Sequence, residues 1–138
     1  MSDLVRMSLS LDKPLFQRLE RLVRRRGVRN RSEFLRDLIR RQLVEREWDA
    51  DREVLGSVTL VYEHHRRKLA EKLTGLGHRH HGAVLVTTHV HLSEQLCAEV
   101  ILIRGKARRI EKLADEMRQQ KGVLHAELSM TTTGADLA

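Results

Sequence analysis

The chain has 138 residues with a formal net charge of +7, and only 3% of the residues are aromatic. This length suits one ordinary domain or two small ones, with a core built from Leu, Val and Ile. A single cysteine excludes an intramolecular disulfide framework, and no apolar run or secretory signal indicates a membrane segment or export, so we expect a cytoplasmic protein with no membrane partner.

The charge is unevenly distributed along the chain. Residues 1–47 hold 13 Lys/Arg and 7 Asp/Glu, whereas the remainder holds 13 and 12. All eight histidines lie in that remainder, from His64 onward. A basic head of this kind indicates an anionic partner, most often nucleic acid, although a solvated cationic surface would have the same composition.

The head begins with a short predicted strand over residues 6–11, where polar and apolar residues alternate. Asp12 then predicts the N-cap of a helix that ends at Gly27. Asn30 caps a second helix that runs to about residue 47, and Glu33 completes a capping box.

One strand and two short helices bury too little apolar surface to fold alone, and the strand would have unpaired edges. Antiparallel pairing with a second copy gives a two-stranded ribbon that fits the major groove of B-DNA. The arrangement resembles the ribbon-helix-helix family of DNA-binding proteins. The ribbon would read bases, and the N-terminus of the second helix would hold a phosphate. The candidate DNA-contacting residues are Arg6, Ser8, Ser10, Arg31 and Ser32.

After a polar linker at residues 49–57, residues 58–132 form a second region, which we call the body, followed by a tail at 133–138. The pattern of the body predicts a strand, helix, strand, strand, helix and strand. The first helix is expected to open at Glu63 and the second to cover residues 106–120. The order is that of a ferredoxin-like βαββαβ domain, here similar to ACT domains. The fold class is therefore α+β.

The central hairpin carries the chemistry. His89 and His91 lie two apart on its first strand, residues 83–92, so both imidazoles leave one face. A tight two-residue turn would place Cys97 on the other face, whereas a five-residue loop from Leu92 to Leu96 places Cys97 opposite His91. We expect the wider loop, which brings two imidazoles and one thiol together.

These ligand types suit Zn(II), Cu(II) or Ni(II) and do not by themselves choose among the three. A fourth ligand is expected from the histidines just before the hairpin, in the same chain or a neighbour. The alternative is two hydrogen-bonded histidines beside an inert core cysteine. Two helices on a four-stranded sheet leave one face bare, and we expect that face to be the one with the histidines and Cys97.

Head and body together resemble the nickel-responsive transcriptional regulators (NikR). The resemblance covers nearly the whole chain and depends on three motifs with consistent spacing: Tyr62-Glu63-His64, His78-x-His80-His81 and His89-Val90-His91-x5-Cys97. It implies a homotetramer, a dimer of dimers with ACT-like domains at its centre. It also implies one nickel ion per subunit, held in a square plane by His89, His91, Cys97 and a neighbour's His78.

The same resemblance suggests further sites. It matches Glu33 and Asp37 to a cation site between the domains, and Arg66 and Arg67 to contacts with the DNA backbone. His64, His65 and His125 are further candidates for weaker metal sites, with plain surface or structural histidines as the alternative.

The expected function is nickel-gated repression at operator DNA. Two alternatives remain open: a ribbon-helix-helix regulator that responds to an amino acid or another small ligand, and a zinc hydrolase. The hydrolase lacks a convincing general base, and Glu99 would more readily support a metal-binding histidine.

Overall fold

A computed structural model describes residues 3–65, 69–80 and 82–137 of the chain. The chain divides into two compact units, residues 1–41 and residues 42–138. Among the described residues, no helix is both long and apolar enough to cross a bilayer.

The first unit contains helix α1 (Lys13–Arg26) and the first part of helix α2 (Arg31–Asp49). Both helices begin with the caps that the sequence predicts. Asp12 accepts a hydrogen bond from the Leu15 amide at 3.3 Å, and Asn30 accepts one from the Glu33 amide at 2.9 Å. Gly27 ends α1 in the left-handed conformation, with φ 63°.

The strand expected at residues 6–11 is absent from the single chain, where residues 3–12 have no regular structure. A strand requires hydrogen bonds from a neighbouring strand, and the expected neighbour is a second copy of the same segment. Helix α1 likewise has no buried residue. The unit leaves many large apolar side chains exposed: Leu4, Val5, Met7, Leu9, Leu15, Phe16, Leu22, Leu38 and Ile39.

The second unit confirms the βαββαβ order. Its elements are β1 (Glu53–Glu63), α3 (Leu69–Arg79), β2 (Val84–His91), β3 (Leu96–Lys106), α4 (Ala107–Arg118) and β4 (Val123–Thr131). The four strands form one antiparallel sheet in the order β2-β3-β1-β4. Both helices pack on the same sheet face, where their apolar side chains form one core with those of β1 and β3.

The polar segment expected to be a linker at residues 49–57 is instead part of this unit. Strand β1 starts at Glu53, five residues earlier than predicted, and α2 extends to Asp49. Trp48 is buried and donates to the Thr131 carbonyl at 2.8 Å. Asp51 accepts from the Arg108 amide at 2.9 Å, so it caps the N-terminus of α4. Tertiary hydrogen bonds of this kind leave no signature in local polarity.

Helix α3, the first helix of the second unit, also begins later than predicted. Glu63 is the last residue of β1, and His64 and His65 form a turn rather than the opening of the helix. Described helical structure starts at Leu69. Arg66 and Arg67 lie outside the described residues, as does His81.

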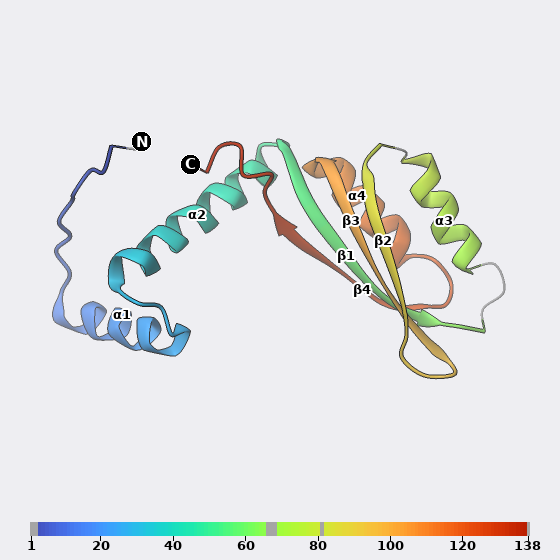
Figure 1. Ribbon diagram of the computed structural model, residues 1–138, viewed down its shortest axis with the longest axis horizontal. Coiled ribbons are helices and arrows are strands. Elements are labelled where there is room, and N and C mark those ends of the chain that lie inside the picture. Colours follow the sequence, from blue (N-terminus) through green and yellow to red (C-terminus); the bar gives the residue numbers. More distant parts are fainter. Residues whose placement is uncertain (1–2, 66–68, 81, 138) are drawn as a thin grey trace. The chain divides into compact units, whose positions relative to one another are not determined.

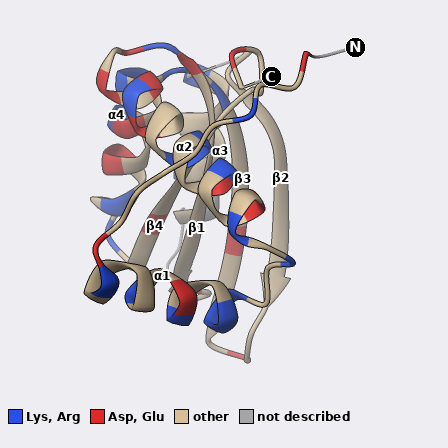
Figure 2. Cartoon of the chain, turned by 90° about the vertical axis from the view of Figure 1, so that its left-hand side faces the viewer, with Lys and Arg blue, Asp and Glu red and all other residues tan. Residues whose placement is uncertain are grey.

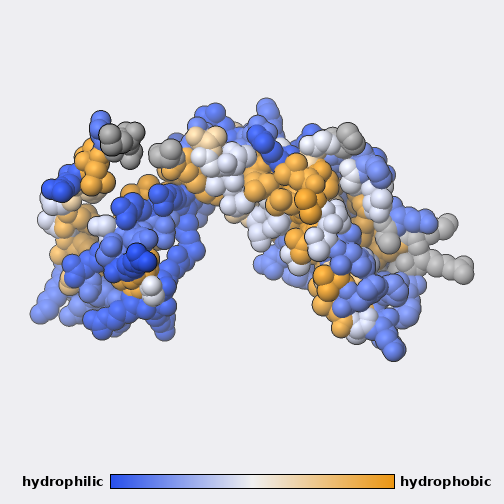
Figure 3. All heavy atoms as spheres, in the orientation of Figure 1, coloured by the Kyte–Doolittle hydropathy of each residue, from blue (hydrophilic) through white to orange (hydrophobic). Residues whose placement is uncertain are grey.

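The bare sheet face is the opposite of the one expected. Cys97, Ile101 and Ile103 face the helices and are buried, whereas Val86, Val90 and Val100 are 53%, 48% and 42% exposed. Figure 3 shows apolar side chains gathered over the strands. Alternation predicts which residues share a face, but both faces of this sheet are apolar, so the sequence does not say which face the helices cover.

Candidate metal centre

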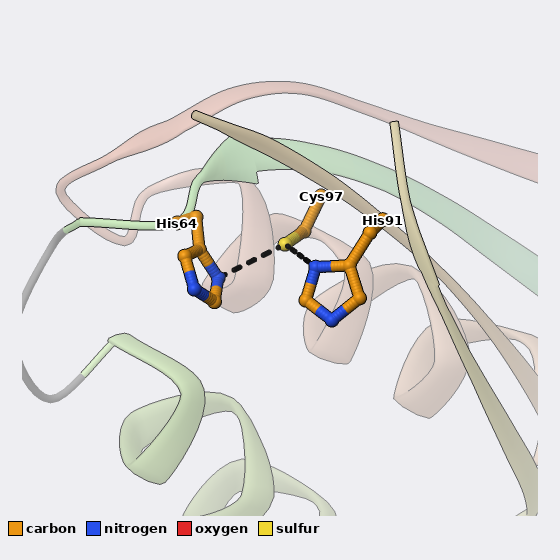
Figure 4. A group of neighbouring side chains, drawn as sticks. All are labelled: His64, His91 and Cys97. Atoms are coloured by element: carbon orange, nitrogen blue, oxygen red, sulfur yellow. Dashed lines mark hydrogen bonds between the residues drawn. The ribbon is translucent and has the colours of Figure 1, made fainter. Parts of the chain in front are cut away.

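Cys97 lies at the start of β3 with no exposed surface, and its Sγ has two imidazole neighbours (Figure 4). His91 ends β2 directly opposite Cys97, which confirms the register predicted for the wider loop. Its Nδ1 lies 3.5 Å from Sγ. His64 follows β1, is anchored by its amide to the Gln95 carbonyl at 2.8 Å, and places Nδ1 3.2 Å from Sγ.

One ligand atom each from His64, His91 and Cys97 lies within 4.8 Å of the other two. Metal–nitrogen and metal–sulfur bonds of about 2.0 and 2.3 Å span such a triangle, so these donors fit a transition metal. Neutral imidazoles and a thiolate also suit Ni(II), Cu(II) and Zn(II) chemically. Within the described parts of the chain, this is the single group of three such donors.

His89 adjoins this group. Its ring centroid lies 4.9 Å from that of His91, and its Nδ1 lies 3.0 Å from the Tyr62 hydroxyl. Tyr62 also shares a hydrogen bond with Glu99, which pairs with His89 across β2 and β3. A hydroxyl that donates to Glu99 can accept the Nδ1 proton of His89. This arrangement leaves Nε2 of His89 free to bind a metal.

The local environment raises the pKa of both Tyr62 and Glu99. Burial, with the negative charges of Glu99 and Cys97, raises the pKa of Tyr62 to about 12. Burial also raises the pKa of the half-buried Glu99 carboxyl, against the effect of His89. The hydroxyl of Tyr62 therefore remains a neutral hydrogen-bonding group around His89 throughout the physiological range.

The fourth predicted ligand does not join the group in the single chain. His78 is exposed near the C-terminal end of α3, beside a cavity of about 540 Å³ that Glu99 also lines. His78 comes nine positions after Leu69 in this helix, about 14 Å along the axis. His80 instead contacts Glu116 of α4 at 3.4 Å.

His64 lies closer to Cys97 than the sequence analysis anticipated. It was expected only as a weaker site, yet it lies nearer to Cys97 Sγ than His91 does. Local patterning gives no signal for this position, because a residue directly after β1 reaches the hairpin end only if β1 pairs with β3. The pairing of Tyr62 with Cys97 provides this contact.

The remaining candidates are exposed or occupied. His125 on β4 is 72% exposed and lies 3.9 Å from Glu127. Asp37 contacts Arg40 at 3.7 Å, and the Glu33 side chain is partly exposed on the same helix. These positions show no further donor arranged for a metal among the described residues.

The candidate DNA-contacting side chains of the first unit differ in whether they already contact other residues of that unit. Arg6, Ser8 and Ser10 are exposed in the segment before α1, and Ser32 is exposed at the start of α2. Arg31 bonds Glu20 and stacks over the Phe16 ring at 4.9 Å. A phosphate contact by Arg31 would therefore compete with these contacts inside the head.

Two family models match the chain. The model described as "NikR C terminal nickel binding domain" matches residues 55–131, and the model described as "Ribbon-helix-helix protein, copG family" matches residues 5–46. Proteins provisionally named nickel-responsive regulators, from Geobacter metallireducens and Geobacter sulfurreducens, are each 48% identical over 138 residues. Those alignments cover 99% of this chain and 99% of each relative.

Solved structures resemble the second unit in fold alone. The ACT domain from GTP pyrophosphokinase of Chlorobium tepidum aligns with a TM-score of 0.50 at 15% identity, covering 56% of this chain and 99% of that one. An uncharacterized protein from Thermotoga maritima aligns with a TM-score of 0.51 at 18% identity, covering 56% and 96%.

Fold and site together define a ribbon-helix-helix transcriptional regulator with a metal-binding, ACT-like second domain. The particular family follows from matches that span both domains: the chain belongs to the nickel-responsive regulators, NikR. It is a regulator and not an enzyme, so the zinc hydrolase alternative is wrong. The family assignment also decides against an amino acid as the primary signal.

Proposed function

We propose that each subunit binds one Ni(II) ion and that the loaded protein, a homotetramer, represses transcription by binding operator DNA. The ligands are His89, His91 and Cys97 of one chain and His78 of a neighbouring chain. The tetramer is a dimer of dimers, joined through paired heads and through the ACT-like domains. The cytosol suits both the reduced thiol of Cys97 and access to DNA.

The observation that carries this proposal is the contact of the buried Cys97 thiol with imidazole nitrogens at the exposed end of a hairpin. A structural cysteine packed only for its volume has no need of two imidazoles at 3.2 and 3.5 Å. The support of His89 by Tyr62 is the outer hydrogen bond that metal-binding histidines commonly make.

A neighbouring chain is the natural source of the fourth donor. His78 is separated from its own hairpin site by the length of α3, while its imidazole is exposed to a partner. The histidines of β2 are also exposed, because β2 is an edge strand. The apolar bare face, with Val86, Val90 and Val100, supplies a second surface for association.

His64 is proposed as a further metal ligand in the single subunit. Its Nδ1 lies 3.2 Å from Cys97 Sγ, so it can bind an ion held by that sulfur. Glu33, Asp37, His65 and His125 are further candidates for cation binding, although no other donors converge on them in the described parts of the chain.

The head is proposed to bind the operator as a dimer, with Arg6, Ser8 and Ser10 at base edges and Ser32 and Arg31 at a phosphate. Bound nickel would supply a bridge between two subunits. A bridge of this kind favours one arrangement of the paired heads. Nickel can change the affinity for DNA only as far as nickel itself binds that arrangement more tightly than the others.

Nickel selectivity cannot come from ligand affinity alone, because Cu(II) binds such donors more tightly. The donor geometry that joins two subunits, together with the metals available in the cell, would have to select the ion.

A subunit-mixing experiment tests the shared site. The variants His78→Ala and Cys97→Ser are each expected to lose high-affinity nickel binding. Mixed after partial denaturation, they should regain about half of the sites present in a mixture of one variant with wild-type, because a Cys97 from one chain can meet a His78 from the other. Absence of any recovery in co-assembled tetramers, confirmed by mass spectrometry, would exclude a site shared between chains.

DNA gating requires its own measurement. Duplexes selected from a random library with nickel-loaded protein should bind tightly with stoichiometric Ni(II) and weakly after chelation. Equal affinity in both conditions would show that metal binding does not control the head.

A further inference from the structure

The positive charge of the head is concentrated on one helix. Helix α1 carries six Lys/Arg and a single acidic residue, Glu20, whereas α2 carries five of each sign. Figure 2 shows basic residues recurring along α1. The proposed base-reading and phosphate contacts lie elsewhere, before α1 and at the start of α2, so they leave this charge unexplained.

Three of the basic residues share one side of the helix. Arg18, Arg21 and Arg25 are spaced by three and four residues, so their side chains are neighbours on a helical surface. With Arg24 and Leu22 they line an open surface hollow of about 510 Å³. All four arginines are exposed. We call this surface, Arg18, Arg21, Arg24 and Arg25, the arginine face.

The charge of this face is not neutralised within the head. Glu20 is bonded to Arg31 of α2. In the described parts of the chain, no carboxylate lies within ion-pair distance of Arg18, Arg21 or Arg25. Like charges at these spacings repel and destabilise a helix. An anionic partner would offset this repulsion.

The spread of the charges favours a polyanion over a single small anion. Arg18 and Arg25 are seven residues apart, which is about 10 Å along a helix axis. Duplex DNA presents one negative charge for about every 1.7 Å of its axis, so several phosphates lie within this span. Guanidinium groups are well suited to phosphate oxygens.

We infer that the arginine face of α1 is a second, sequence-independent binding surface for the phosphates of duplex DNA. The inference takes its partner from the proposed function and adds a surface that acts on any sequence. Such a surface raises affinity for operator and non-operator DNA alike, so it lengthens the time spent on DNA without choosing a site.

The test uses full-length, nickel-loaded protein and mixed-sequence duplex DNA over a series of salt concentrations. The triple variant Arg18→Gln/Arg21→Gln/Arg25→Gln should make the plot of log affinity against log salt concentration less steep, by about 2 to 3 per chain. Each lost phosphate contact removes about 0.9 from the magnitude of this slope. A matched control, Arg108→Gln/Arg109→Gln/Lys112→Gln on α4, removes the same charge from exposed positions outside the head and should change the slope much less.

A second variant separates lost contacts from lost folding. Arg18→Lys/Arg21→Lys/Arg25→Lys keeps the charge and should keep the wild-type slope. Equal slopes for the glutamine variant and its α4 control would overturn the inference, and so would a loss of slope in the lysine variant. If both glutamine variants retain nickel-dependent operator binding while their slopes are equal, only this inference fails and the proposed function stands.

Discussion

At the scale of single residues, the site depends on one sulfur atom and on the hydrogen bonds around the imidazoles. Cys97 is fully buried, but two imidazole nitrogens reach its sulfur from the surface side. This combination protects the thiol within the core and still allows an ion to enter. His89 and His91 remain exposed on the edge strand, so ligand exchange does not require the core to open.

Replacement of the sulfur should abolish tight nickel binding. Cys97→Ser is expected to lower nickel affinity by more than about 100-fold, because loss of even an outer hydrogen-bond partner of a ligand costs about 10–100-fold. The thiolate-to-metal charge-transfer band should disappear, as measured by absorption during nickel titration. His125→Ala, at an exposed histidine on β4 outside the Cys97 group, serves as the control and should keep the charge-transfer band. A persistent band in the serine variant would contradict the assignment of Cys97.

The environment of Tyr62 predicts a defined pH dependence. Its pKa is raised from 10.0 to about 12, chiefly by burial. The folded state therefore keeps a proton that the unfolded chain loses near pH 10, so the free energy of unfolding should fall as pH rises from 10 to about 12. Below pH 10, both states hold the proton and this contribution is complete.

Tyr62 is the only tyrosine in the chain, so the ultraviolet absorbance of tyrosinate reports this one group. We expect a titration midpoint close to 12, with the variant Tyr62→Phe lacking the transition. A midpoint near the ordinary value of 10 in folded protein would show that the hydroxyl is solvated and not buried against Glu99.

At the scale of elements, the junction of α2 with the sheet is tightly packed. The ring of Trp48 and the side chains of Ile110 and Leu128 approach Gly56 on β1, leaving no room for a side chain there. Trp48 also bonds the last residue of β4. The close approach explains why a glycine stands in the middle of a strand, where it otherwise weakens the sheet.

The same substitution at two glycines should therefore have opposite effects. In Gly56→Ala, the new Cβ would lie 3.0 Å from Ile110, 3.1 Å from Trp48 and 3.2 Å from Leu128, and we expect a loss of about 1–3 kcal/mol. In Gly75→Ala, within α3, nothing lies within 4 Å of the new Cβ, and the helix should gain about 0.5–1 kcal/mol. Chemical denaturation of both variants measures the difference, and a neutral Gly56→Ala would contradict the packing.

At the scale of the whole molecule, each unit exposes apolar surface that a second chain can cover. In the head, α1 has no buried residue, and in the body the sheet face opposite the helices remains open. Two separate self-association surfaces on one chain are what a dimer of dimers requires.

Charge placed on the bare sheet face should reduce the assembly to dimers. Burial of a valine contributes about 1.5–3 kcal/mol, and a buried unpaired carboxylate costs more, so Val90→Glu/Val100→Glu should dissociate the tetramer. Sedimentation velocity gives the oligomeric state. Leu124→Glu, at another exposed apolar position, should leave it unchanged. A tetramer that survives the double substitution would mean that the body associates through another surface.

The sequence by itself determined the order of elements in the second unit, the helix caps and the contact of His91 with Cys97. These features follow from local chemistry: alternation, capping side chains and a loop whose length sets the strand register. Its motifs also identified the family, because several spacings had to agree at once.

The tertiary structure alone decided three other features: the face of the sheet that the helices cover, the inclusion of Trp48 and residues 53–57 in the second unit, and the position of His64 beside Cys97. Each depends on contacts between segments that are distant in sequence. Both sheet faces are apolar, and the end of β1 approaches the hairpin only because β1 pairs with β3. Local patterning carries no information about such contacts, since their energies arise only when the chain is folded.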